Sequence, residues 1–156
     1  MNVPKRILPL IVLSQFFCTS LWFAGNAIIN DLVINYNIQP EALGQLTSSV
    51  QLGFITGTLL FALMTITDLY SPVKVFFVSA VLGAMFNFGM NWSDNNLITL
   101  LVFRFLTGVC LAGIYPVGMK IASDYYVEGL GKSLGFLVGA LVLGTALPHL
   151  LKGTLI

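Results

Sequence analysis

The stretch from Ala42 to Thr67, ALGQLTSSVQLGFITGTLLFALMTIT, runs for 26 residues without a charged side chain. A helix rises about 1.5 Å per residue, so about 20 apolar residues cross the roughly 30 Å hydrocarbon core of a bilayer. Transmembrane strands are about 10 residues long and alternate in polarity, and this stretch does not alternate. The sequence therefore predicts a membrane-spanning helix here.

Four further apolar runs flank this one, and each is nearly free of charge. The short connections between the runs require neighbouring helices to be antiparallel. We therefore predict an all-α, polytopic transmembrane helix bundle, with one domain over residues 1–156. The five predicted spans are approximately 7–30, 43–67, 75–92, 96–119 and 133–151.

The composition supports a membrane environment. Hydrophobic residues make up 57% of the chain and charged residues 8%, with a mean hydropathy of +0.93, whereas a soluble domain carries about 25% charged residues. The lipid bilayer is thus the expected partner of most of the surface. A net charge of +1 gives no reason to expect a nucleic acid partner, and Cys18 and Cys110 lie in apolar runs, which argues against a disulfide framework or a metal site.

The basic residues predict the orientation. Cytoplasmic loops are enriched in Lys and Arg, and a cytoplasmic N-terminus places five of the six basic residues outside the spans on the inner side. Those five are Lys5, Arg6, Lys74, Lys120 and Lys132. The sixth, Lys152, is then on the outer side of the membrane. We therefore expect a multi-pass protein of the cell (inner or plasma) membrane. A cleaved signal peptide is the less favoured interpretation of the first run, because the apolar core of a signal is only about 7 to 15 residues long.

Enzymatic function is not expected. The chain has a single histidine, His149, and lacks the common metal-hydrolase, nucleophile-elbow and phosphate-binding motifs. We also expect no cofactor and no metal.

Arg104 is the most informative single residue, because it lies inside the fourth predicted span. A charge at the centre of a bilayer costs about 2.5 to 3.5 kcal/mol on insertion scales, so it is expected to face the bundle interior. Three roles stay open from the sequence. They are a structural role bonding to groups on a neighbouring helix, a role in coupling or anion binding, and snorkelling to the interface.

Glycines and polar residues mark possible contact faces and a possible pathway. Gly53 and Gly57 form a GxxxG pair, and Gly131, Gly135 and Gly139 repeat at the same spacing. Such faces let membrane helices pack closely, and they also suit helices that slide. Polar residues of the first two spans either line a pathway or bond within the bundle.

The fourth span carries a recognisable pattern: Arg104-Phe-Leu-Thr-Gly108-Val-Cys-Leu-Ala-Gly113-Ile-Tyr-Pro116-Val-Gly118. This resembles the fourth-helix motif of the major facilitator superfamily, R-x-x-x-G followed by G-x-x-P. The loop after the second span resembles the family's other signature in keeping Asp68 and a displaced basic residue, Lys74. Within that pattern, Ser71 and Met64 stand where the family has glycine.

The resemblance covers the whole chain as helices one to five of twelve, an N-terminal half that lacks its sixth helix. It implies a secondary transporter of a small-molecule solute that works by alternating access, with the site between two six-helix halves. Trp22, Asn26, Arg104 and Tyr115 are then expected to line the cavity. Asp68, Lys74, Gly108, Gly113 and Pro116 are expected to act in conformational change. The missing C-terminal half is expected in a longer chain.

The substrate and the coupling ion stay open. Proton coupling is one option, although the first span holds no carboxylate, and the fifth lacks the glycine-proline run of drug/proton antiporters. The alternative function is a small membrane scaffold or assembly protein that packs partner helices through its glycine faces.

Overall fold

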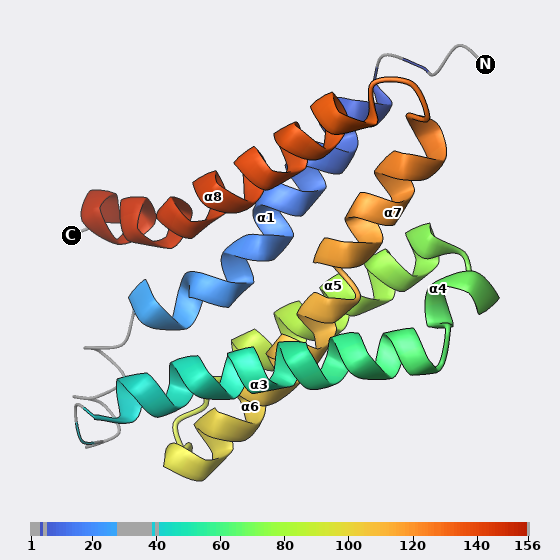
Figure 1. Cartoon of the computed structure of the whole chain (residues 1–156). Coiled ribbons are helices and arrows are strands. Elements are labelled where there is room, and N and C mark those ends of the chain that lie inside the picture. Colours follow the sequence, from blue (N-terminus) through green and yellow to red (C-terminus); the bar gives the residue numbers. More distant parts are fainter. Residues whose placement is uncertain (1–3, 5, 28–38, 40, 156) are drawn as a thin grey trace.

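The computed structural model describes residues 4, 6–27, 39 and 41–155. Every regular element in these residues is a helix (Figure 1). The helices are α1 (Ile7–Ala27), α3 (Ala42–Leu63), α4 (Ile66–Leu69), α5 (Pro72–Gly89), α6 (Leu97–Ala112), α7 (Tyr115–Tyr125) and α8 (Leu130–Leu155). The chain is therefore an all-α membrane bundle, as the hydropathy predicts.

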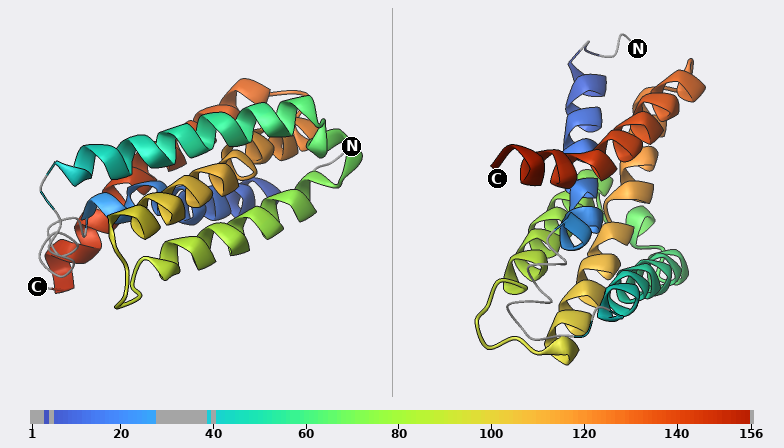
Figure 2. Two further views of the ribbon diagram at one scale, coloured as in Figure 1. Left: turned by 90° about the horizontal axis from the view of Figure 1, so that it is seen from below. Right: turned by 90° about the vertical axis from the view of Figure 1, so that its left-hand side faces the viewer.

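Four helical stretches within the described residues are long and apolar enough to cross a membrane. They are Ala42–Leu63, Pro72–Gly89, Leu97–Tyr125 and Leu130–Leu147, and the stretch Ile7–Phe23 is apolar but shorter. Successive long helices run in opposite directions along one axis of the bundle, and α1 begins at the end opposite to the one where α8 ends (Figures 1 and 2). The last residues of the predicted first span, 28–30, lie outside the described residues.

The closest helix pair is α3 with α6, and glycine contacts explain why. A Cβ atom at Gly53 would collide with the backbone carbonyl of Phe105, and one at Gly108 would collide with that of Val50. Ser49 adds a hydrogen bond from its Oγ to the Leu101 carbonyl at 2.7 Å. A Cβ at Gly57 would likewise lie 2.9 Å from the Val109 carbonyl oxygen. Glycine lets two membrane helices approach until their backbones touch, so the packing interpretation of the second span's GxxxG pair is confirmed for both glycines.

The second major pair is α1 with α8, which lie side by side (Figure 1). Here the close approach is at Gly144, whose hypothetical Cβ would lie 2.9 Å from the Thr19 Oγ1. In contrast, no described atom lies within 4 Å of a Cβ built at the three glycines of the GxxxGxxxG repeat, which are Gly131, Gly135 and Gly139. The described residues therefore leave this face of α8 without a partner.

The fourth span is broken into α6 and α7. The backbone N–H groups of Gly113 and Ile114 bond to carbonyls three residues back, Cys110 at 2.9 Å and Leu111 at 3.0 Å. Pro116 is at the start of α7, where its missing N–H is tolerated. The sequence predicts an interruption of the helix at Pro116, and in the structure the helix stops at Ala112, one turn before the proline.

Candidate functional site

A few polar side chains are buried inside the bundle, while others, such as Gln45, Ser48 and Gln51 of α3, are exposed. The exterior carries exposed leucine, isoleucine, valine and phenylalanine side chains, as a lipid-facing surface requires. Among the residues that the structure describes, six polar or charged residues are buried: Gln15, Thr19, Ser79, Arg104, Thr107 and Ser133. The hydroxyl groups of Thr19 and Thr107 bond to carbonyls of their own helices, at 2.7 and 2.8 Å. Arg104 and Gln15 are the two buried groups with larger hydrogen-bonding demands.

Arg104 lies on α6 and is 1% exposed. Its two terminal nitrogens donate to consecutive carbonyls of α1, Nη1 to Leu21 at 3.3 Å and Nη2 to Trp22 at 2.7 Å. The Nε atom has no hydrogen-bond partner among the described residues. The guanidinium therefore joins the fourth span to the first through backbone acceptors and keeps one inward-facing donor unused. This geometry contradicts snorkelling to the membrane interface.

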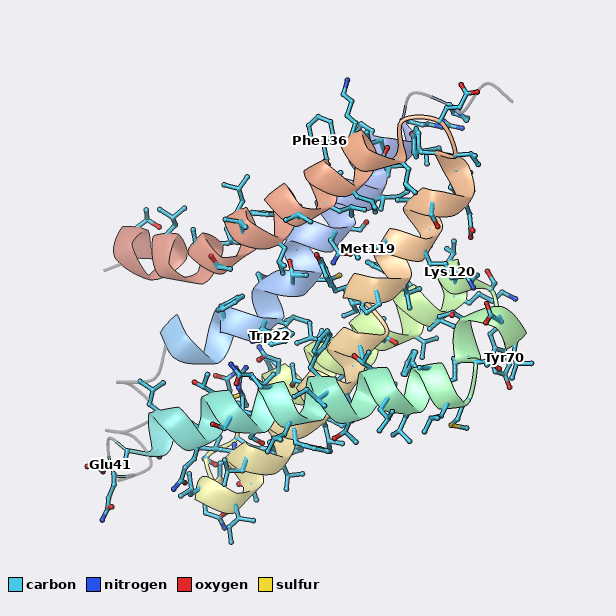
Figure 3. The ribbon with its side chains drawn as sticks, viewed as in Figure 1. Trp22, Glu41, Tyr70, Met119, Lys120 and Phe136 are labelled. Atoms are coloured by element: carbon cyan, nitrogen blue, oxygen red, sulfur yellow. The ribbon has the colours of Figure 1, made fainter. Side chains whose placement is uncertain are left out.

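Trp22 contributes its carbonyl to Arg104, while its ring packs elsewhere. The indole lies against Phe54 of α3, with ring centroids 4.8 Å apart and a tilt of 60°. Figure 3 shows Trp22 between α1 and α3. The residue thus connects α1 to α6 through its backbone and to α3 through its ring.

The structure gives less information on the other two residues that are expected to line the cavity. Tyr115 is half-buried at the first position of α7, beyond the break in the fourth span. Asn26 lies on α1, one turn after Trp22, but its side chain is outside the described part of the structure. The structure therefore brings Trp22 and Arg104 together and leaves the placement of Asn26 and Tyr115 as a prediction.

Gln15 is fully buried, and neither Oε1 nor Nε2 has a hydrogen-bond partner among the described residues. Its Oε1 packs against the Cα of Gly118 on α7, where a Cβ would collide with it. A buried amide without hydrogen-bond partners costs free energy. In the sequence, Gln15 is only one of several polar residues in the first span, and nothing there separates it from Ser14 or Ser20.

Two of the expected motif residues belong to packing contacts. Gly108 touches α3, as described above, and Gly113 is the C-cap of α6, with the Ser79 hydroxyl of α5 against it. A side chain at either position would push α6 away from a neighbour. Glycine is therefore needed at these two positions because α3 packs against Gly108 and α5 packs against Gly113.

Asp68 has a partner that the sequence does not reveal. It lies on α4, a single turn that follows Thr65, whose φ of 47° is in the left-handed region. Its carboxylate forms an ion pair with the Nζ of Lys120 on α7, with the two side chains 66% and 34% exposed. Lys74, the other charged residue of the expected loop motif, is exposed and has no ion-pair partner among the described residues. The pair connects the loop after α3 with the end of the fourth span.

The comparisons with known proteins agree with this arrangement. A family model described as Major Facilitator Superfamily matches residues 10–156. A protein of Haemophilus influenzae (strain ATCC 51907 / DSM 11121 / KW20 / Rd), named "Putative metabolite transport protein", is 29% identical over 140 residues. The match covers 83% of this chain and 33% of that protein, so the chain spans about a third of the length of the relative. No solved structure gives a significant match.

Proposed function

Because the chain belongs to the major facilitator superfamily, we propose that it forms the N-terminal part of a secondary transporter that moves a small solute across the cell membrane by alternating access. The observation that carries this proposal is the buried Arg104, which bonds to α1 through two of its three nitrogens. A charge kept at membrane depth is costly and marks functional sites in membrane proteins. The name of the Haemophilus influenzae relative also points to solute transport.

In this proposal, Arg104 acts at the junction of the first and fourth helices. Trp22, Asn26 and Tyr115 would line the solute pathway that a second helical domain completes, and the buried, unpaired Nε–H of Arg104 would be within the junction behind them. Arginine presents several fixed donors, so an anionic or carbonyl-bearing solute fits this site. A solute that bonds to the guanidinium would compete with the carbonyls of Leu21 and Trp22 and would loosen the α1–α6 junction.

The broken fourth span supports a conformational role for Gly113 and Pro116. The segment before the break, α6, is fixed to α3 by backbone contacts at glycine. The segment after it, α7, contacts α1 at Gly118 and pairs with Asp68 through Lys120. Bending at the break would move α7 relative to α6 without separating α6 from α3.

The experiment that tests the proposal is solute uptake by the full-length gene product in vesicles, screened across small organic anions, sugars and amino acids. Arg104→Lys and Arg104→Ala are compared with Leu59→Ala, a control at an exposed position of α3. We expect the two arginine variants to lose most of the uptake that the wild type and the control show, at equal membrane abundance. Unchanged uptake in both arginine variants would remove Arg104 from the mechanism.

One observation favours the alternative role as a helix-packing scaffold. The glycine face of α8 has nothing within 4 Å of a Cβ at Gly131, Gly135 or Gly139, and small-residue faces of this kind bind other membrane helices. The scaffold role predicts that the 156-residue chain is stable when expressed alone. It also predicts that the chain co-purifies with a partner protein and that no solute changes its thermal stability.

A further inference from the structure

A groove of about 360 Å³ opens on the side of the bundle between α3 and α5. Phe61 of α3 forms one wall, Val78 and Leu82 of α5 form the other, and Val109 of α6 lies at its floor. These side chains are apolar, and Val78 is 53% exposed. In a membrane protein such a groove faces acyl chains unless protein covers it.

Two polar residues line this otherwise apolar groove. Lys74 lies at its end, beside Tyr70, which is 65% exposed and marks the α4 end of the bundle (Figure 3). Ser79 also lines the groove; it is 7% exposed, and its hydroxyl has no hydrogen-bond partner among the described residues. Its hydroxyl lies against Gly113 of α6, as described above, so Ser79 is part of the inner wall of the groove.

The positive charge of Lys74 is not neutralised within the described structure. Asp68, the acidic residue nearest to it in the sequence, pairs with Lys120. Lys74 therefore presents a free cation next to an apolar channel. Under the orientation argued above, this end of the bundle lies at the cytoplasmic leaflet, whose anionic lipids attract basic residues close to the membrane.

We propose that the groove binds one anionic phospholipid of that leaflet, with its phosphate on Lys74 and one acyl chain between α3 and α5. Ser79 follows Lys74 by five positions on α5, which places it about 7.5 Å deeper along the helix axis. The ester carbonyls of a glycerophospholipid lie one glycerol unit below the phosphate, and so between the levels of Lys74 and Ser79. The Tyr70 ring lies at the headgroup level, where aromatic side chains are favoured. The site depends on the membrane position of the chain and not on solute transport.

The test is lipid retention by the full-length protein. The protein is purified from vesicles of phosphatidylglycerol and phosphatidylcholine in equal amounts, and the retained lipids are counted by native mass spectrometry. We expect retention of phosphatidylglycerol over phosphatidylcholine, and about a fivefold loss of that preference in Lys74→Gln, since one basic residue near an anionic surface contributes about that factor. Lys132→Gln, which removes an exposed cation on α8, is the matched control and keeps the preference.

A further variant tests the apolar part of the site. Val78→Trp, which fills the groove, lowers retention of both lipids. Inorganic phosphate at millimolar concentration leaves the bound lipid in place, because a free phosphate lacks the acyl chain. Equal effects of Lys74→Gln and Lys132→Gln would overturn the proposal. So would a photo-crosslink from position 78 to another segment of the protein, because protein would then occupy the groove.

Discussion

Lys120 and Asp68 form an ion pair that links α7, the second segment of the fourth span, to α4, the single-turn helix after the second span. The two residues are 52 positions apart in the chain, and both are partly exposed. The pair holds α4 against α7 at the end of the bundle where α1 begins (Figure 1). It is thus placed to report on any movement of α7 relative to α3.

The ion pair is expected to contribute little to stability. Exposed pairs contribute about 0.2–1 kcal/mol in double-mutant cycles. We expect Asp68→Asn and Lys120→Gln each to lower the unfolding temperature slightly, and the double variant to lower it by less than the sum. The measurement is thermal unfolding of the detergent-solubilised protein. Strict additivity of the two effects would show that the pair does not form in solution.

Substitution of the contact glycines is expected to destabilise the bundle according to their packing. Gly53→Ala forces a methyl group against the Phe105 carbonyl, whereas Gly139→Ala meets open space. Overpacking costs about 1–3 kcal/mol, so Gly53→Ala unfolds at a lower denaturant concentration while Gly139→Ala stays close to the wild type. A large loss in Gly139→Ala, measured on the full-length protein, would instead show that another segment packs on that face.

The stability of an Arg104 variant is expected to depend on whether the new side chain is charged. Arg104→Met removes a buried cation, and the carbonyls of Leu21 and Trp22 stay within a helix that continues to Ala27. Arg104→Lys keeps the buried charge but loses the geometry that reaches two acceptors. We therefore expect Arg104→Lys to be the less stable variant in a denaturant titration. The reverse order would indicate that the guanidinium has a further, charged partner.

Replacing Gln15 with a nonpolar residue is expected to raise the stability of the fold. Both of its amide atoms are buried without partners in the described residues, and an unsatisfied buried polar group costs about 1–3 kcal/mol. Gln15→Met keeps a similar shape and is expected to stabilise the fold while reducing solute uptake. Thermal unfolding and vesicle uptake check the two halves of the prediction. A less stable Gln15→Met variant would mean that water or another segment satisfies the amide.

The orientation can be checked with reporter fusions. A fluorescent protein that folds only in the cytoplasm is joined after Ile156 in one fusion and after Glu128, in the turn between α7 and α8, in another. A cytoplasmic N-terminus predicts a dark product for the first and a fluorescent product for the second. The opposite result would reverse the assignment of the basic residues to the inner side.

The sequence predicts where the long helices lie and that neighbours run in opposite directions, because bilayer thickness imposes a length that charged residues delimit. Asp94 lies between two helices of the structure, whereas Asp68, Lys74 and Lys120 lie within α4, the first turn of α5 and α7. Arg104 is also predictable as a buried residue, because an isolated charge in a long apolar run has to face inward.

The partners of these residues are not predictable in the same way. Arg104 bonds to backbone carbonyls, which every residue carries, so no side chain in the sequence marks Leu21 and Trp22 as its acceptors. The partner of Asp68 depends on how far α7 extends beyond the break at Gly113. The difference between Gly53 and Gly139 depends on which helix lies opposite, and the same spacing occurs in both faces.

The contact between α3 and α6 has a mechanical consequence. Where Gly53 meets the Phe105 carbonyl and Gly108 meets that of Val50, no side chain lies between the helices. Side chains at an interface can change rotamer and so absorb small shifts, but two backbones in contact cannot. We therefore expect these two helices to move as one rigid unit, so that any change of shape in the bundle would be taken up at the break before α7 and along the contact between α1 and α8.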